Sequence, residues 1–172
     1  VKPIKFSSTR DAREFIKKYE DVEGFDVHGY DRFVYQFIAD KYPKHVDYDF
    51  QTLKIYTIDI EVASENGFPD VESVSEEILC MTIKDLNTKQ VHTWAVREFD
   101  APVDVNVHLY DNENSMMRGF IEWWAHNTPD IVTGWNCNLY DIPYICRRVS
   151  RILDDKWARS LSPWNRIKEN EI

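Results

Sequence analysis

Apolar and polar residues alternate over residues 53–62, and this pattern predicts a β-strand. Successive side chains of a strand point to opposite faces, so Asp59 and Glu61 share one face, while Ile60 and Val62 continue the apolar face past them. We therefore expect the two acids to project from a stiff strand that is anchored in a core. A carboxylate in such a place costs free energy unless a partner neutralises its charge.

More strands are predicted after a loop at residues 64–77 that is rich in acids and turn formers. The first two of them are joined by a hairpin-like connection, Asn87-Thr88-Lys89. The predicted strands cover residues 78–86, 90–96, 105–110 and 130–135.

Apolar residues three and four positions apart predict two helices before residue 130. One follows the N-cap residues at positions 7–9, and the other follows Asp111 or Asn112 as its N-cap. Residues 33–42 fit either a strand or a short helix. The apolar faces of the two helices are formed by Ala12, Phe15, Ile16 and Tyr19, and by Met117, Phe120, Ile121 and Trp124.

A third helix is predicted over residues 142–153, with Pro143 in its first turn. Asp141 stands directly before this helix and is a good candidate for its N-cap. Ligands also collect in the loops that follow strands in open α/β sheets, so a third acid at this crossover suits a site for metal and phosphate. The residues by themselves leave both interpretations of Asp141 open.

The predicted order is an antiparallel meander, a helix, a strand and a helix. This order is typical of an α/β fold with a ribonuclease-H-like mixed sheet and flanking helices. The first fifty residues carry a weaker pattern and are interpreted as an accessory piece.

The composition, with 43% hydrophobic and 14% aromatic residues, fits a folded globular protein. The three cysteines form no CxxC pair, which favours a reducing compartment and no structural zinc. The five histidines are scattered without metal-ligand spacing. No apolar run has the length of a membrane span and the start is not signal-like, so we expect neither membrane insertion nor secretion.

The net charge of −9 argues against a protein that coats nucleic acid generally, because phosphate binding rests on Lys and Arg. Residues 142–168 are nevertheless basic and hold seven of the 21 Lys and Arg residues. An acidic body with a basic segment can hold a metal in one place and phosphate in another, although a solvated helix face explains the segment equally well.

A divalent cation is the partner that Asp59 and Glu61 predict, because no Lys or Arg lies in their strand beyond Lys54. Carboxylate oxygens suit Mg²⁺ or Mn²⁺ far better than zinc. The alternative is that both acids end the strand in solvent.

Two motifs give the chain a family resemblance. Asp59-Ile60-Glu61, followed by Gly67-Phe68-Pro69, is the first. The second runs from Thr133-Gly134-Trp135-Asn136 to Tyr140-Asp141-Ile142-Pro143-Tyr144. Together they resemble the first two exonuclease motifs of family B DNA polymerases, in particular the replicative polymerases of T-even-type bacteriophages. The resemblance covers most of the chain but only a small part of a polymerase.

The resemblance implies a DNA-directed DNA polymerase with 3′→5′ exonuclease (proofreading) activity on single-stranded or frayed DNA. Asp59, Glu61 and Asp141 then hold two Mg²⁺ (or Mn²⁺) ions, which lie about 3.5–4 Å apart in two-metal sites. By analogy, Asp59 contacts both ions, Glu61 the ion that holds the nucleophile, and Asp141 the outer one. The fold is then a truncated DEDD exonuclease fold over residues 51–172, preceded at residues 1–50 by part of a small α+β N-terminal domain.

The DNA-binding residues implied by the resemblance are Phe68, Asn136 and Tyr140. Phe68 matches a loop aromatic that packs against the unpaired end of the strand, where stacking contributes on the order of 1–3 kcal/mol per base. The implied partners are the 3′ end of single-stranded DNA, the remainder of the polymerase chain, and a sliding clamp with other replisome proteins. The implied location is the cytoplasm of an infected bacterial host cell, with no membrane partner.

The family's third motif, a Tyr with an Asp four residues later, does not occur in these residues, and Tyr144 followed by Arg148 does not replace it. We therefore expect a cut fragment that binds metal weakly and hydrolyses DNA poorly or not at all.

Two other functions remain open. The first is a metal-independent single-stranded nucleic-acid-binding or docking module, in which residues 142–168 grip phosphates. The second is another nuclease of the same fold, such as a ribonuclease H or a transposase-like enzyme. Those enzymes lack the spacing from Asn136 to Tyr140 and Asp141 that is found here.

Overall fold

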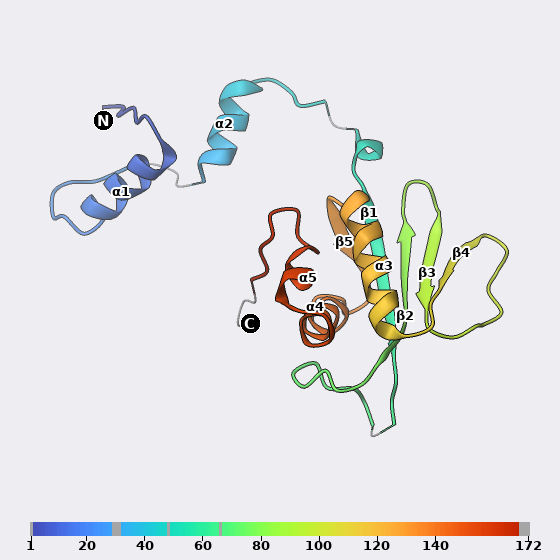
Figure 1. Ribbon diagram of the computed structural model, residues 1–172. Coiled ribbons are helices and arrows are strands. Elements are labelled where there is room, and N and C mark those ends of the chain that lie inside the picture. Colours follow the sequence, from blue (N-terminus) through green and yellow to red (C-terminus); the bar gives the residue numbers. More distant parts are fainter. Residues whose placement is uncertain (1, 29–31, 48, 66, 169–172) are drawn as a thin grey trace. The chain divides into compact units, whose positions relative to one another are not determined.

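A computed structural model describes residues 2–28, 32–47, 49–65 and 67–168. The chain divides into two compact units, Val1–Tyr48 and Asp49–Ile172. Each is described by itself below (Figure 1). The assignment of residues 1–50 to a polymerase N-terminal domain stays a prediction.

Within its described ranges, the first unit contains two helices, α1 (Thr9–Tyr19) and α2 (Phe33–Lys41). The predicted N-cap of α1 is confirmed, because the Ser8 hydroxyl accepts a hydrogen bond from the Asp11 amide at 3.1 Å. The segment 33–42, which fitted either a strand or a helix, forms α2. Among the described residues of this unit, Ala12 is the one buried side chain.

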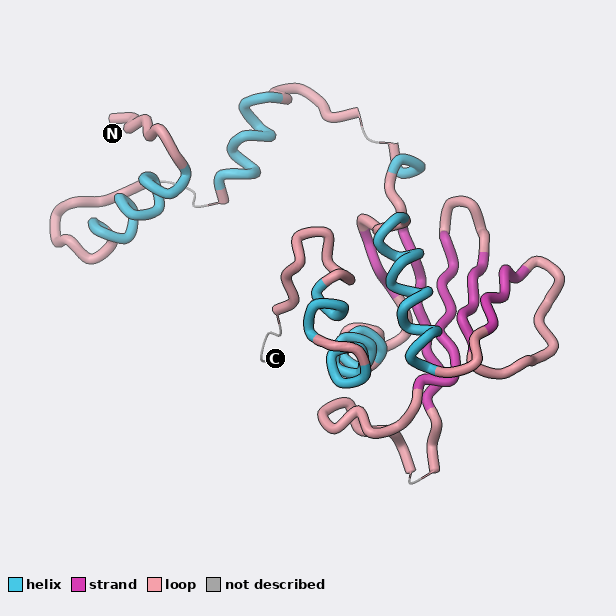
Figure 2. Tube along the Cα trace, viewed as in Figure 1, coloured by secondary structure: helices cyan, strands magenta, loops and turns pink. Residues whose placement is uncertain are grey.

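The described residues of the second unit form a five-stranded sheet, three α-helices and a short 3₁₀ helix, η1. Its elements in chain order are η1 (Phe50–Thr52), β1 (Ile55–Val62), β2 (Ile78–Asp85), β3 (Val91–Ala95), β4 (Val105–Leu109), α3 (Glu113–His126), β5 (Ile131–Thr133), α4 (Asp141–Ile152) and α5 (Asp155–Arg159). Figure 2 shows that most of the connection between β1 and β2 is loop.

The strand order is β4-β3-β2-β1-β5. β1, β2 and β3 form the antiparallel part of the predicted meander, and β5 joins β1 in parallel. The prediction that the meander continues antiparallel is wrong for β4, which pairs parallel with β3 from Val91↔Val105 to Ala95↔Leu109. The connection at residues 96–104 is long enough to bring the chain back to the start of β3 before β4 begins.

The core lies between the sheet and the helices α3 and α4, which pack against one of its faces (Figure 1). Asn112 caps α3 as predicted, accepting from the Ser115 amide at 3.0 Å. The four apolar positions predicted for this helix are all buried. The fully buried side chains of the core include Ile58, Met81 and Trp94 from the sheet, Met117 and Phe120 from α3, and Tyr144 and Val149 from α4. This arrangement is the ribonuclease-H-like α/β fold that the sequence predicts.

All three cysteines are free thiols. In the described part of the chain, no helix combines the length and the apolar character that crossing a membrane requires.

Candidate functional site

The two acids of β1 lie on one face of the strand, as the alternation predicts. Ile58 and Ile60 are buried on the opposite face, with exposed fractions of 2% and 7%. Asp59 and Glu61 are exposed. The expectation that burial makes their charges costly is therefore wrong, because only the apolar face of β1 is covered by the helices.

Asp141 supplies the buried carboxylate of the site, with an exposed fraction of 3%. Of the two interpretations left open for Asp141, the N-cap of α4 is wrong: the helix begins at Asp141 itself, and Tyr140 holds the cap position without a side-chain hydrogen bond. The Asp141 carboxylate instead accepts from the backbone N–H of Ile60 at 3.1 Å. β5 pairs with β1 only over residues 55–57, so the edge of β1 beyond that point is open to Asp141.

The segment between β5 and α4 explains how Asp141 reaches β1. A Cβ added to Gly134 would lie 2.5 Å from the carbonyl oxygen of Ile58, so only glycine permits this approach of the two backbones. Asn136 adopts a φ of 55°, a left-handed conformation that asparagine tolerates better than most residues. Its carbonyl accepts from the amides of Leu139 and Tyr140, each at 3.0 Å. This turn leads directly into α4, which begins at Asp141.

The charges of Asp59 and Glu61 act on the carboxylate of Asp141. Burial raises the pKa of Asp141, and the charges of Asp59 and Glu61 raise it further. Burial also raises the pKa of Tyr140, with smaller contributions from Asp141 and Glu61. Asp59 and Glu61 are therefore close enough to Asp141 for their charges to disfavour its ionised form, and a cation beside Asp141 would relieve this repulsion.

The donor set fits a hard divalent cation, because Asp59, Glu61 and Asp141 offer only oxygens. As the side chains stand, no three His, Cys, Asp or Glu residues within the described ranges are grouped closely enough to enclose a metal ion. A bound cation would thus require the two exposed β1 side chains to move, whereas Asp141 is held by its hydrogen bond to Ile60.

Aromatic side chains stand beside the carboxylates. Phe68, which is 84% exposed, contacts Tyr140 with ring centroids 5.1 Å apart. Asn136, also expected to bind DNA, is exposed in the same crossover segment. Trp135 has no role predicted from the sequence, yet the residue is 93% exposed next to Asn136. Its place inside the second motif was the signal that could have drawn attention to it.

The basic segment does not present all of its arginines to solvent. Arg147, Arg148 and Arg151 each donate hydrogen bonds to backbone carbonyls in the connection between β1 and β2. These three arginines thus have structural partners, which weakens the interpretation that residues 142–168 exist to grip phosphates.

Residues 26–172 match the family model described as DNA polymerase family B, exonuclease domain. The chain is 29% identical to the DNA-directed DNA polymerases of Escherichia phage RB69 and Enterobacteria phage T4, over 97% and 99% of its length. It spans only 21% and 22% of those two relatives. It is also 32% identical to a DNA polymerase of Acanthamoeba polyphaga mimivirus, over 64% of this chain and 7% of that relative.

Proposed function

The chain belongs to the exonuclease-domain family of the family B DNA polymerases, and from this premise we propose that residues 51–172 form the first part of a 3′→5′ proofreading exonuclease. Residues 1–50 are proposed to be part of the N-terminal domain of the same polymerase. The observation that supports the proposal is the hydrogen bond from the amide of Ile60, which stands between Asp59 and Glu61 on β1, to the buried carboxylate of Asp141.

The proposed ligands of the divalent cations are Asp59, Glu61 and Asp141. Two Mg²⁺ or Mn²⁺ ions bound there would activate the attacking water and stabilise the departing 3′ oxygen. Asp141 is preset for this task because its hydrogen bond to Ile60 orients the carboxylate without neutralising it. Asp59 and Glu61 project from a strand whose other face is locked in the core, so their backbone positions are fixed.

The proposed DNA-binding residues are Phe68, Tyr140 and Asn136. Phe68 offers an exposed ring, and Tyr140 a half-buried ring in contact with it, on which a terminal base can stack. A mispaired 3′ end has already lost part of its stacking and pairing, so it reaches these rings at lower cost than a paired end. This difference would give the site its preference for frayed ends.

The 172 residues by themselves are proposed to be weakly active or inactive, because they contain no Tyr-x-x-x-Asp third motif. The remainder of the polymerase chain is the proposed partner that completes the site. Through that parent chain, a sliding clamp and other replisome proteins would be indirect partners, in the cytoplasm of an infected bacterial cell.

Metal binding provides the first test. Mn²⁺ at ten times its Kd is expected to stabilise the folded chain by about 1.4 kcal/mol, which raises the unfolding temperature by about 3 °C. Asp59→Ala and Asp141→Asn should remove this shift. Asp141→Asn should also raise the unfolding temperature without metal, because it keeps an oxygen for Ile60 while removing a buried charge. Asp104→Asn, an exposed acid, is the matched control and should leave the Mn²⁺ shift intact.

Nucleotide release from single-stranded DNA in the presence of Mn²⁺ provides the second test. We expect little or no release from the chain alone, and a robust rate that Asp59→Ala abolishes would contradict the proposed incompleteness. Salt-dependent DNA binding that persists in EDTA and survives Asp59→Ala would favour a binding module instead.

A further inference from the structure

One face of α4 holds the loop that leads from β1 to β2. Tyr144, Arg147, Arg148 and Arg151 follow one another at positions i, i+3, i+4 and i+7, so they form a row along one side of the helix. All four donate hydrogen bonds to backbone carbonyls between Val71 and Glu76. The donor-to-acceptor distances are 2.8 Å for Tyr144 to Glu76, 3.0 Å for Arg147 to Val71, 2.8 and 2.9 Å for Arg148 to Val74 and Ser75, and 2.7 Å for Arg151 to Ser73.

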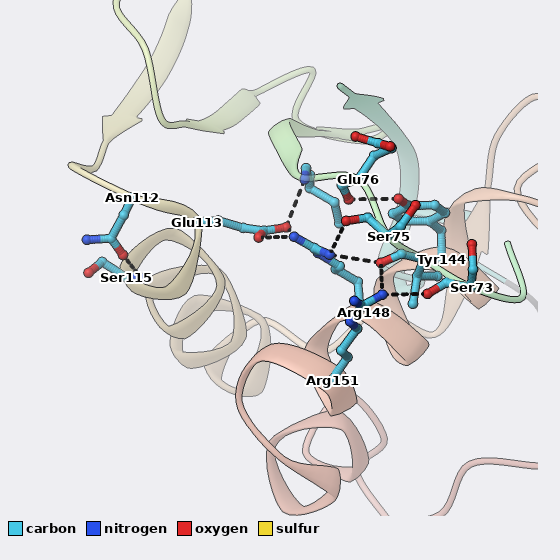
Figure 3. Close-up of polar contacts among 11 residues, drawn as sticks. Ser73, Ser75, Glu76, Asn112, Glu113, Ser115, Tyr144, Arg148 and Arg151 are labelled. Carbon is cyan, nitrogen blue, oxygen red and sulfur yellow. Dashed lines mark hydrogen bonds and ion pairs between the residues drawn. The ribbon is translucent and has the colours of Figure 1, made fainter. Parts of the chain in front are cut away.

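A buried ion pair fixes the centre of this row (Figure 3). Arg148 and Glu113, at the start of α3, form a bidentate pair at 2.8 and 2.7 Å, and their exposed fractions are 6% and 7%. Glu113 also accepts from the amide of Ile78, the first residue of β2, at 2.8 Å. The end of the loop is therefore bonded to α3 through Glu113 and to α4 through Arg148.

The backbone of the loop is strained at the carbonyls that the arginines of α4 bind. Val74 has a φ of 40°, a conformation that β-branched residues rarely adopt. Such a conformation persists only where the surrounding contacts determine it. Here the carbonyls of Ser73, Val74 and Ser75 all accept from Arg148 or Arg151. The α4 row therefore sets the path of the loop more strictly than a simple connection between two strands requires.

The other end of the same loop carries Phe68, whose ring rests on Tyr140. Tyr140 in turn packs on Tyr144, with ring centroids 5.6 Å apart, and Tyr144 belongs to the row. Asp141 follows Tyr140 directly in the chain. The helix that presents the buried carboxylate, together with its N-cap Tyr140, thus contacts the loop both over residues 71–76 and at Phe68.

We propose that the α4 row, through Arg148 and Arg151, positions Phe68 for stacking on the 3′-terminal base. This inference rests on the proposed exonuclease function and adds positioning residues to it. The arginines act through the loop and touch no DNA themselves. Their effect on DNA binding must therefore pass through Phe68.

A double-mutant cycle tests this coupling. Arg151→Ala is the main variant, because Arg151 is exposed and its loss should leave the core intact. The affinity of the 172-residue chain for a fluorescein-labelled single-stranded oligonucleotide is measured by anisotropy with Ca²⁺ present. We expect Arg151→Ala to weaken binding by about 3- to 10-fold, but to have almost no effect in a Phe68→Ala background, as coupled residues should behave.

Arg159→Ala is the matched control, since it removes an exposed arginine from the same basic segment. It should weaken binding by less than about 2-fold, in keeping with the loss of one distant charge. Equal effects of Arg151→Ala and Arg159→Ala, or additive effects of Arg151→Ala and Phe68→Ala, would overturn the positioning role.

Amide hydrogen exchange without DNA separates this inference from the proposed function. Exchange over residues 68–76 should be faster in Arg151→Ala than in the wild type and unchanged in Arg159→Ala. Unchanged exchange in Arg151→Ala, with normal DNA binding by the wild type, refutes the positioning role alone. A wild-type chain that binds no single-stranded DNA refutes the proposed function. The role of the α4 row in DNA binding is then refuted as well, even if Arg151→Ala speeds hydrogen exchange in the loop.

Discussion

The two units of the chain contain similar kinds of residues but use them differently. In Asp49–Ile172, the apolar side chains of one sheet face meet those of α3 and α4 and are buried. In the described residues of Val1–Tyr48, only Ala12 is buried, and large side chains such as Val34 and Phe37 are 70% and 65% exposed. Apolar residues therefore do not make a core by their number. They need a second layer whose apolar face can cover theirs.

The same contrast extends to polar groups. Among the described residues of the second unit, the buried polar side-chain atoms all have hydrogen-bond partners, as Glu113 has in Arg148. In the first unit, the ion pairs of the described residues are exposed, as between Arg10 and Glu14, and such pairs contribute little. Single substitutions should therefore cost much more in the second unit than in the first.

The largest effect is expected from Glu113→Ala. This change leaves the buried guanidinium of Arg148 without its counterion, and breaking such a pair typically costs about 3–5 kcal/mol. Urea denaturation followed by circular dichroism measures the loss. Glu122→Ala, an exposed acid on the same helix, should change stability by less than about 0.5 kcal/mol. Similar losses for the two variants would mean that the ion pair does not hold the unit together.

Gly134→Ala should have the next largest effect. The added methyl would collide with the carbonyl of Ile58, and overpacking of this kind costs about 1–3 kcal/mol. It should also displace Asp141 and so weaken the Mn²⁺ response. Gly24→Ala in the first unit meets no atom within 4 Å, although its φ of 75° makes the change locally strained. Because this strain lies outside Asp49–Ile172, it should leave the main unfolding transition unchanged. A Gly134→Ala protein with full stability and a normal Mn²⁺ shift would show that this close approach is not needed.

Acid pH should destabilise the second unit moderately through His92 and His108, whose ring nitrogens lie 3.2 Å apart. Burial lowers the pKa of both, and the charge of His108 lowers that of His92 further. Because the unfolded chain takes up protons first, stability present at pH 7 is lost as the pH falls below about 6.5. Urea denaturation between pH 7.5 and about 5.5 should show this loss. His108→Asn should flatten the profile and His28→Asn, exposed in the first unit, should not.

The smallest effect is expected from Phe37→Ser in the first unit. Its ring is already 65% exposed, so the free energy of unfolding should change by less than about 0.5 kcal/mol. Phe120→Ser, at a position that is 1% exposed, provides the contrast and should cost several times more. A large loss of unfolding free energy for Phe37→Ser would indicate that this surface is covered in the folded protein. It would contradict the conclusion that the two units differ in how they bury apolar residues.

The sequence by itself determined the elements and the order in which they occur. The alternation at residues 53–62 placed Asp59 and Glu61 on one face of β1, and helical spacing found the buried side of α3. The two motifs also pointed to the family to which the chain belongs. These features succeed because each depends on residues that are neighbours along the chain.

Only the tertiary structure decided what Asp141 contacts, which way β4 runs, and where the arginines of α4 point. Asp141 binds the backbone of a residue 81 positions away, and Arg148 pairs with a residue 35 positions away. Local sequence offered Asp141 a helix cap, but the unpaired edge of β1 provided a buried N–H that needed an acceptor. Periodicity reports which face of an element is apolar. It carries no information about which distant backbone group that element will meet, because this depends on how the layers pack.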